Sequence, residues 1–220
     1  MRSETKMYEL PLFPLNTVLF PGMPLPLHIF EDRYKEMVAD CIRDNRPFGV
    51  VLIAEGAAEG GPLARPYAIG CTAEIAQVQP LDGGNMLIMT VGRERFRVVR
   101  LGRDEKPYLV GMVEPTPLLE DNPEQLEARA EALEPLVIEY LHKLATLGTI
   151  DMEPDQVPSE PLGLIYLAAT LIQLPPDEKQ AFLAAERATT LAGNLARAYR
   201  RELALMRTMP TEDIGIFSIN

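Results

Sequence analysis

The chain has 220 residues, 47% hydrophobic content and a formal net charge of −11. It is long enough for one large domain or two small ones, each with a buried core. Its acidic balance argues against nucleic acid as a partner, since phosphate binding needs clustered Lys and Arg, and no stretch reaches the roughly 18 uninterrupted apolar residues of a membrane helix. The first residues also lack a basic, then apolar leader. We therefore expect a cytoplasmic protein that binds neither nucleic acid nor a membrane.

Short β-branched runs separated by proline and glycine fill the first 115 or so residues, which is typical of strands joined by turns. We expect the first three strands at residues 8–13, 17–20 and 25–30. Prolines within these runs remove backbone donors, so the strands should be edge-like, bent or interrupted. Residues 31–44 break the pattern, because apolar residues recur there at spacings of three and four. This segment is predicted to be a short helix on the sheet.

The next part of the chain predicts a buried strand and then a series of strands with tight turns. Residues 48–54 form a continuous apolar run, which suits a strand buried on both faces, and a glycine-rich loop is expected after it. Asp82-Gly83-Gly84 can adopt positive φ and predicts a hairpin turn. Further strands are predicted at 69–78, 85–91, 95–101 and 108–114. Closing an antiparallel sheet of this kind into a barrel would hide its edges, so we expect a β-barrel with one inserted helix.

The pattern becomes helical after residue 117. Asn122 and Pro123 form a helix start, and Pro135 should kink or split the helix that follows. A second, largely apolar helix is expected at 161–174 and a long third helix at 177–206. The predicted organisation is a β-barrel subdomain at 1–117, an α-helical bundle at 118–210 and a tail at 211–220. In that tail, Ile214, Ile216 and Phe217 are expected to dock on the protein's own surface or on a partner copy.

The residue types that most enzymes need are scarce or dispersed. No Gly-Lys pair occurs, which argues against a P-loop ATPase, and the three serines lie outside any nucleophile motif. His28 and His142 are far apart and have no ligand-spaced partner, while Cys41 and Cys71 lack the spacing of a zinc or redox site and are read as free thiols. The sequence therefore predicts a protein that is not an enzyme and has no catalytic, cofactor or metal site.

Two groups of residues are candidates for binding. Met86, Met89 and Met112 could contact varied apolar partners, because the methionine side chain is flexible and polarizable, although core filling is the usual role of such residues. Arg93 and Arg95 belong to a local cluster of arginines and are the candidate anion site. The first group suits a polypeptide partner, and the second suits a small molecule or a nucleotide derivative.

The opening segment LPLFPLNTVLFPGMPLPLHIFEDRYKEMVADCI is similar to the start of the substrate-binding domain family of Lon proteases. Further matches keep their order along the chain: FGVVLIAEG, IGCTAEI, the DGG turn, GRERFRV and LPPDEKQAFLAAERATTLAGNLARAYRREL. The resemblance implies an α+β fold, with a partly open six-stranded antiparallel β-barrel of the PUA-like type followed by a C-terminal helical bundle. The Walker motifs and the Ser-Lys peptidase of Lon proteases have no counterpart in these residues.

The resemblance implies a non-catalytic module that recognises exposed apolar segments in unfolded or degron-bearing polypeptides. Such a module would act as an adaptor for proteolysis or protein quality control, beside a protease. The alternative is a small-molecule or nucleotide-derivative binding protein that uses the mouth of the barrel. RNA binding is suggested only by the barrel type and is disfavoured by the net charge of −11.

Overall fold

Most of the predicted strands are present in the computed structural model, which describes residues 6–56, 65–102, 106–146 and 157–208. The strands are β1 (Tyr8–Leu15), β2 (Pro24–Ile29), β3 (Phe48–Glu55), β4 (Arg65–Pro66), β5 (Ile69–Pro80), β6 (Met86–Gly102) and β7 (Leu109–Pro115). The strand predicted at 17–20 is absent, because Pro21 and Gly22 turn the chain and Met23 N–H donates to the Phe20 carbonyl at 3.0 Å. Its apolar residues are buried without strand pairing.

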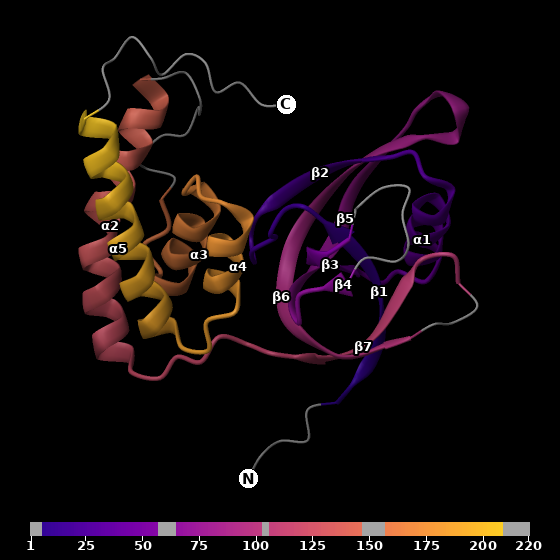
Figure 1. Cartoon of the computed structure of the whole chain (residues 1–220), viewed down its shortest axis with the longest axis horizontal. Helices are drawn as coiled ribbons and strands as arrows, with labels where there is room; N and C mark the ends of the chain where they lie inside the picture. The colour runs from indigo at the N-terminus through magenta and orange to yellow at the C-terminus, as the bar shows by residue number, and fades with distance from the viewer. Residues whose placement is uncertain (1–5, 57–64, 103–105, 147–156, 209–220) are drawn as a thin grey trace. The chain divides into compact units, whose positions relative to one another are not determined.

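Five strands form a closed ring in the order β1, β7, β6, β5 and β3 (Figure 1). The ring closes through a parallel pairing of β1 with β3, in which Leu12 lies opposite Gly49, whereas its other pairings are antiparallel. The α+β class is therefore confirmed. The expected six-stranded antiparallel barrel is corrected to a ring of five strands, because β2 and β4 attach outside the ring. One pairing of the ring is parallel, and the segment between β1 and β3 is long enough for the crossover that this pairing needs.

A single bent strand, β6, replaces the two strands predicted at 85–91 and 95–101. One residue of β5, Thr72, lies between the pairs Cys71–Arg95 and Ala73–Gly92, whereas two residues of β6, Arg93 and Glu94, lie there, so β6 carries a bulge. A Cβ at Gly92 would overlap the carbonyl oxygen of Phe20, so only glycine allows this close backbone approach. The bend lets one strand pair with β2, β5 and β7.

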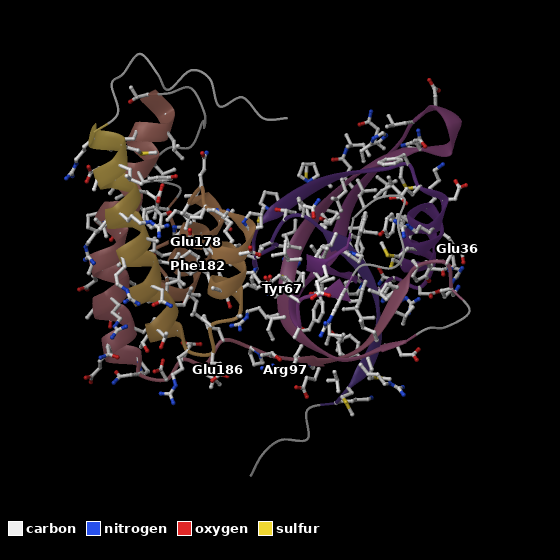
Figure 2. The ribbon with its side chains drawn as sticks, in the orientation of Figure 1. Glu36, Tyr67, Arg97, Glu178, Phe182 and Glu186 are labelled. Atoms are coloured by element: carbon white, nitrogen blue, oxygen red, sulfur yellow. The ribbon has the colours of Figure 1, made fainter. Side chains whose placement is uncertain are left out.

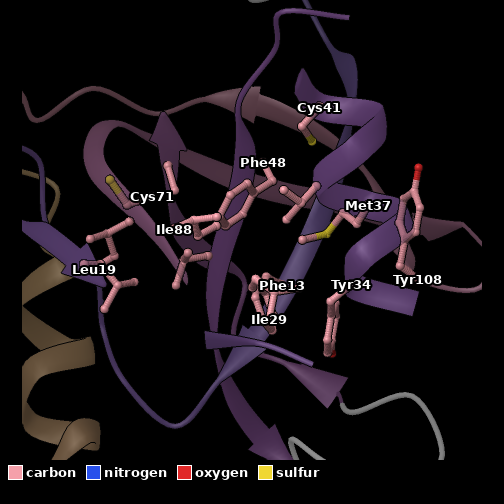
Figure 3. Packing of buried hydrophobic residues seen from close by; sticks show 14 residues of the cluster. Phe13, Leu19, Ile29, Tyr34, Met37, Cys41, Phe48, Cys71, Ile88 and Tyr108 are labelled. Atoms are coloured by element: carbon pink, nitrogen blue, oxygen red, sulfur yellow. The ribbon is translucent and has the colours of Figure 1, made fainter. Parts of the chain in front are cut away.

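Helix α1 (Asp32–Arg43) packs its apolar side on the ring, as predicted. Met37 and Cys41 are buried with Phe48 of β3, and the rings of Phe13 and Tyr34 stack at 4.0 Å between centroids (Figure 3). Each such large side chain stabilises the fold by roughly 1.5–3 kcal/mol on burial. The core of the β unit is thus shared by α1 and the strands.

Four helices are described after the strands, and the first two begin near the predicted residues. They are α2 (Pro123–Thr146), α3 (Pro161–Leu171), α4 (Pro176–Leu183) and α5 (Ala188–Thr208). Asn122 caps α2, since its Oδ1 accepts the N–H of Gln125 at 3.0 Å. Helix α2 continues through Pro135, so the helix is not split there.

The prediction of one long third helix at 177–206 is wrong, because this segment forms two helices, α4 and α5, joined by a short non-helical stretch. The backbone of Leu119 forms hydrogen bonds with the residues between α4 and α5. Its N–H donates to the carbonyl of Glu186 at 3.0 Å, and its carbonyl accepts the N–H of Ala188 at 2.8 Å. These bonds replace the intrahelical bonds that a continuous helix would make.

Helix α4 belongs to the β unit rather than to the helical unit. Gln180 donates its side-chain amide to the Ile69 carbonyl at 3.0 Å, and the Tyr67 hydroxyl donates to Asp177 at 3.0 Å; Tyr67 is labelled in Figure 2. The β unit comprises 1–118 and 174–184, and the helical unit comprises 119–173 and 185–220. The expected tail at 211–220 and the core of the glycine-rich loop lie outside the described residues. Among the helices that the structure describes, none is long and apolar enough to cross a membrane.

Candidate functional site

An apolar surface lies on the side of β2 and β6 that faces away from the core. The antiparallel register places Pro26 opposite Met89 and His28 opposite Leu87. Exposed fractions are 40% for Leu87, 38% for Met89 and 45% for Phe30, which follows β2 directly. We define the outer apolar face by the exposed residues Pro24, Pro26, Phe30, Leu87 and Met89. Large exposed side chains grouped in this way are typical of a binding surface.

The three candidate methionines do not share one surface. Met89 lies on the outer apolar face, but Met86 lies on the opposite face of β6 and packs against the core. Met112 lies on β7, opposite Glu9 of β1 and Arg100 of β6. Leu87 and Phe30 were not among the candidates; the alternation of β6 about the buried Ile88 is the sequence signal that could have identified Leu87.

A second feature is a groove of about 550 Å³ in the β unit. One wall is the end of α1 and the segment after it, and the other is a continuous stretch of β5 from Glu74 to Val78. Its volume lies within the roughly 300–1,000 Å³ range of ligand pockets. The groove is lined by Tyr8, Cys41, Ile42, Asn45, Arg46, Pro47, Thr72, Glu74, Ile75, Ala76, Gln77, Val78, Arg93 and Glu94.

The two candidate arginines are in different environments. Arg93 lines the groove, where its Nε lies 2.6 Å from the carboxylate of Glu74. Arg95 is buried, with 4% of its surface exposed. The structure therefore does not present both guanidinium groups on one surface, and the charge of Arg93 is balanced by Glu74.

Asp40 is the most strongly perturbed carboxylate among the described residues. It is buried on α1 and accepts hydrogen bonds from Lys106 Nζ at 2.7 Å and the Tyr108 hydroxyl at 2.6 Å, and Arg43 Nη1 lies 2.7 Å from it. These groups hold the pKa of Asp40 well below its usual range, with the Lys106 bond as the largest cause. Asp40 therefore stays ionised and fixes α1 to the segment before β7.

The thiols have the properties of structural rather than reactive cysteines. Burial raises the pKa of Cys41 to about 11 and that of Cys71 to about 12, so little thiolate forms at neutral pH. Both are free and buried. In the part of the chain that the structure describes, no group of three or more His, Cys, Asp or Glu side chains is arranged to hold a metal ion.

Comparisons with known families agree with this arrangement. Residues 9–192 match the family model of the ATP-dependent protease La (LON) substrate-binding domain. Lon protease 2 of Myxococcus xanthus is 31% identical over 179 residues, which are 79% of this chain and 21% of that protein. The chain thus spans about a fifth of the length of this relative.

Solved structures show the same likeness. A Lon N-terminal domain protein from Xanthomonas campestris is 28% identical, with a TM-score of 0.57 over 92% of this chain and 99% of that chain. The N-terminal domain of the Lon protease of the Mycobacterium avium complex is 18% identical, with a TM-score of 0.69 over 88% of this chain and 98% of that chain. The second likeness supports the fold alone.

Proposed function

The chain belongs to the family of Lon substrate-binding domains, and from that premise we propose that it is a non-catalytic module that binds unfolded or degron-bearing polypeptides. The observation that carries this proposal is the outer apolar face on β2 and β6. Folded proteins expose few such apolar segments, whereas unfolded chains expose many. A surface of this kind therefore selects unfolded partners by burying apolar area.

The two prolines of β2 favour binding through side chains on this face rather than through an added strand at the edge of β2. Pro24 and Pro26 lack backbone N–H groups, so β2 offers few donors to an added strand. The neighbouring Leu87 and Met89 supply a γ-branched and a flexible side chain, which can adapt to varied apolar partners. The outer apolar face thus suits recognition of composition rather than of one sequence.

We further propose that the module acts as an adaptor in the cytoplasm, beside a protease, in proteolysis or quality control. We also propose that the ring is of the PUA-like type and that the chain binds no nucleic acid. The alternative of a small-molecule or nucleotide-derivative binding protein that uses the mouth of the barrel has less support at the candidate arginines, because Arg93 is paired with Glu74 and Arg95 is buried.

The test is a pair of fluorescence anisotropy titrations, in which this chain is added to a labelled test protein. The test protein is used in two forms, one reduced and carboxymethylated so that it is permanently unfolded, and one native. We expect saturable binding of the unfolded form only. Equal binding of both forms, or binding of neither, would contradict the proposal.

A further inference from the structure

The groove in the β unit contains an open strand edge. Strand β5 pairs with β3 only from Cys71 to Ala73, because the chain before Phe48 turns away into α1. Beyond Ala73, among the described residues, β5 pairs with β6 alone as far as Pro80. The other edge of this stretch faces the groove, whose lining includes every residue from Glu74 to Val78.

Strand β6 lies between β2 and β5. Backbone hydrogen bonds near the two ends of this three-stranded part show which backbone N–H and C=O groups of β5 point to the open edge. Gly92 of β6 bonds toward β2, since its N–H donates to Met23 and its carbonyl accepts from Gly22, each at 2.9 Å. Asn85 bonds toward β5, since its carbonyl accepts the N–H of Leu81 at 2.8 Å. Bonding direction alternates along an antiparallel strand, so the even-numbered residues of β6 face β2 and the odd-numbered residues face β5.

The register then identifies the open groups of β5. Glu74 and Gln77 lie opposite the odd-numbered residues Val91 and Met89, so they bond to β6. Ile75 and Val78 lie opposite the even-numbered Thr90 and Ile88, whose backbone groups face β2. The N–H and C=O groups of Ile75 and Val78 consequently point away from β6, into the groove.

The wall opposite this edge is a well-defined helix end. Asn45 has a positive φ of 48°, its N–H donates to Ile42 at 3.2 Å, and the N–H of Arg46 donates to Cys41 at 3.0 Å. These two bonds form a Schellman motif, which satisfies the last carbonyls of α1. The wall therefore offers side chains to a ligand, of which Ile42 is 50% exposed.

The chemistry of the lining favours a neutral and partly apolar occupant. Arg46 and Arg93 are balanced by Glu74 and Glu94, so the lining selects no strong net charge. Ile42 on one wall and Val78, which is 38% exposed, on the other provide apolar contacts. An extended peptide supplies both the backbone partners and the side chains that such a groove needs.

We propose that the groove between the β5 edge and α1 binds an extended, apolar-rich and near-neutral segment of an unfolded polypeptide as an added strand. The incoming backbone pairs with the open groups of Ile75 and of Val78, which lie on the two sides of the β5 bulge at Ala76, and its side chains contact Ile42. This inference rests on the proposed function and names a binding site for it that is distinct from the outer apolar face.

Val78→Pro is the most direct variant, because it removes an N–H that points into the groove and leaves the β6-facing groups of Gln77 and Gln79 in place. Val78→Ala is its matched control, since it keeps the N–H and shortens the side chain. In anisotropy titrations with the reduced and carboxymethylated protein, we expect Val78→Pro to weaken binding at least tenfold and Val78→Ala to weaken it less than threefold.

A second variant and a second readout cover the case in which Val78→Pro does not fold. Ile42→Asp changes an exposed side chain and should also weaken binding about tenfold, which corresponds to ~1.4 kcal/mol. Amide hydrogen exchange of the full chain should slow at Ile75 and Val78 when the unfolded protein is added. Wild-type affinity in folded Val78→Pro or in Ile42→Asp, or unchanged exchange at both amides while the unfolded protein is bound, would overturn the groove inference alone.

Two other outcomes are distinguishable. If the wild-type chain binds no unfolded protein, the proposed function fails and the groove inference fails with it. If the amides of Ile75 and Val78 become protected with increasing concentration of the chain alone, the edge pairs with a second copy, and the groove inference is overturned in favour of self-association.

Discussion

The carboxylate of Asp40 on α1 accepts a hydrogen bond of 2.6 Å from the hydroxyl of Tyr108, a residue 68 positions further along the chain. This bond and the 2.7 Å bond from Lys106 join α1 to the segment that leads into β7. Because α1 also forms one wall of the groove, the pair holds that wall in place. The buried carboxylate thereby connects the stability of the β unit to the geometry of its candidate binding site.

Asp40→Asn should lower the free energy of unfolding by about 1.5–3 kcal/mol, the usual contribution of hydrogen bonds to a charged group. The amide keeps the shape of the carboxylate but removes the charge that Lys106 and Arg43 neutralise. Urea unfolding monitored by circular dichroism measures the change. Asp32→Asn is the control, since Asp32 is exposed and its ion pair with Lys35 should contribute less than about 1 kcal/mol. Equal effects of the two substitutions would contradict this role of Asp40.

The contribution of Asp40 should also depend on pH. The hydrogen bonds from Lys106 and Tyr108 lower its pKa in the folded protein, whereas an unfolded Asp has a pKa of about 3.9. A group whose folded pKa is lowered stabilises the fold fully above the unfolded pKa, and this stability is lost as pH falls through the folded pKa. The stability difference between wild type and Asp40→Asn should be constant near pH 6 and shrink below about pH 4. A difference that grows on acidification would exclude this account.

Cys41 and Cys71 should react slowly with a thiol reagent while the chain is folded. Burial raises the pKa of both thiols, to about 11 and about 12, and limits access of the reagent. At pH 8, Ellman's reagent should modify the two thiols at least 100-fold faster in denaturing urea than in buffer, an order-of-magnitude expectation for buried thiols. Rapid modification of one thiol in buffer would show that its surroundings open readily.

The double substitution Leu87→Ser and Met89→Ser should weaken binding of an unfolded protein about tenfold, because it removes two exposed apolar contacts worth together ~1.4 kcal/mol. Both side chains point away from the core, so the melting temperature should change little. Leu205→Ser, an exposed apolar position on α5, is the matched control and should leave affinity unchanged. Equal losses in the two variants would indicate nonspecific apolar association.

Much of the fold was predictable because local patterns decide it. The continuous apolar run at 48–54 predicted a strand buried on both faces, and β3 has that burial along most of its length. The turn at Asp82 was predictable because Gly83 and Gly84 adopt positive φ. By contrast, the break between α4 and α5 depends on hydrogen bonds that Glu186 and Ala188 make with Leu119, which is distant in sequence, so helical periodicity alone could not reveal it.

The candidate site was less predictable for the same reason. Met89 was identified by residue type, but its place opposite Pro26 depends on the pairing of β2 with β6, which local sequence patterns do not specify. The open edge of β5 depends on β3 ending its pairing at Ala73. Neither is a property of a local run of residues. Both follow from which strands are neighbours and where their pairing ends.

The most direct test of the central claim is a nuclear magnetic resonance titration of the ¹⁵N-labelled full chain with a reduced and carboxymethylated protein. Binding of unfolded polypeptide by the β unit predicts saturable shifts or line broadening at the amides of Leu87, Met89, Ile75 and Val78, and none with the native form of the same protein. An unchanged spectrum, or changes confined to α2, α3 and α5, would contradict the account.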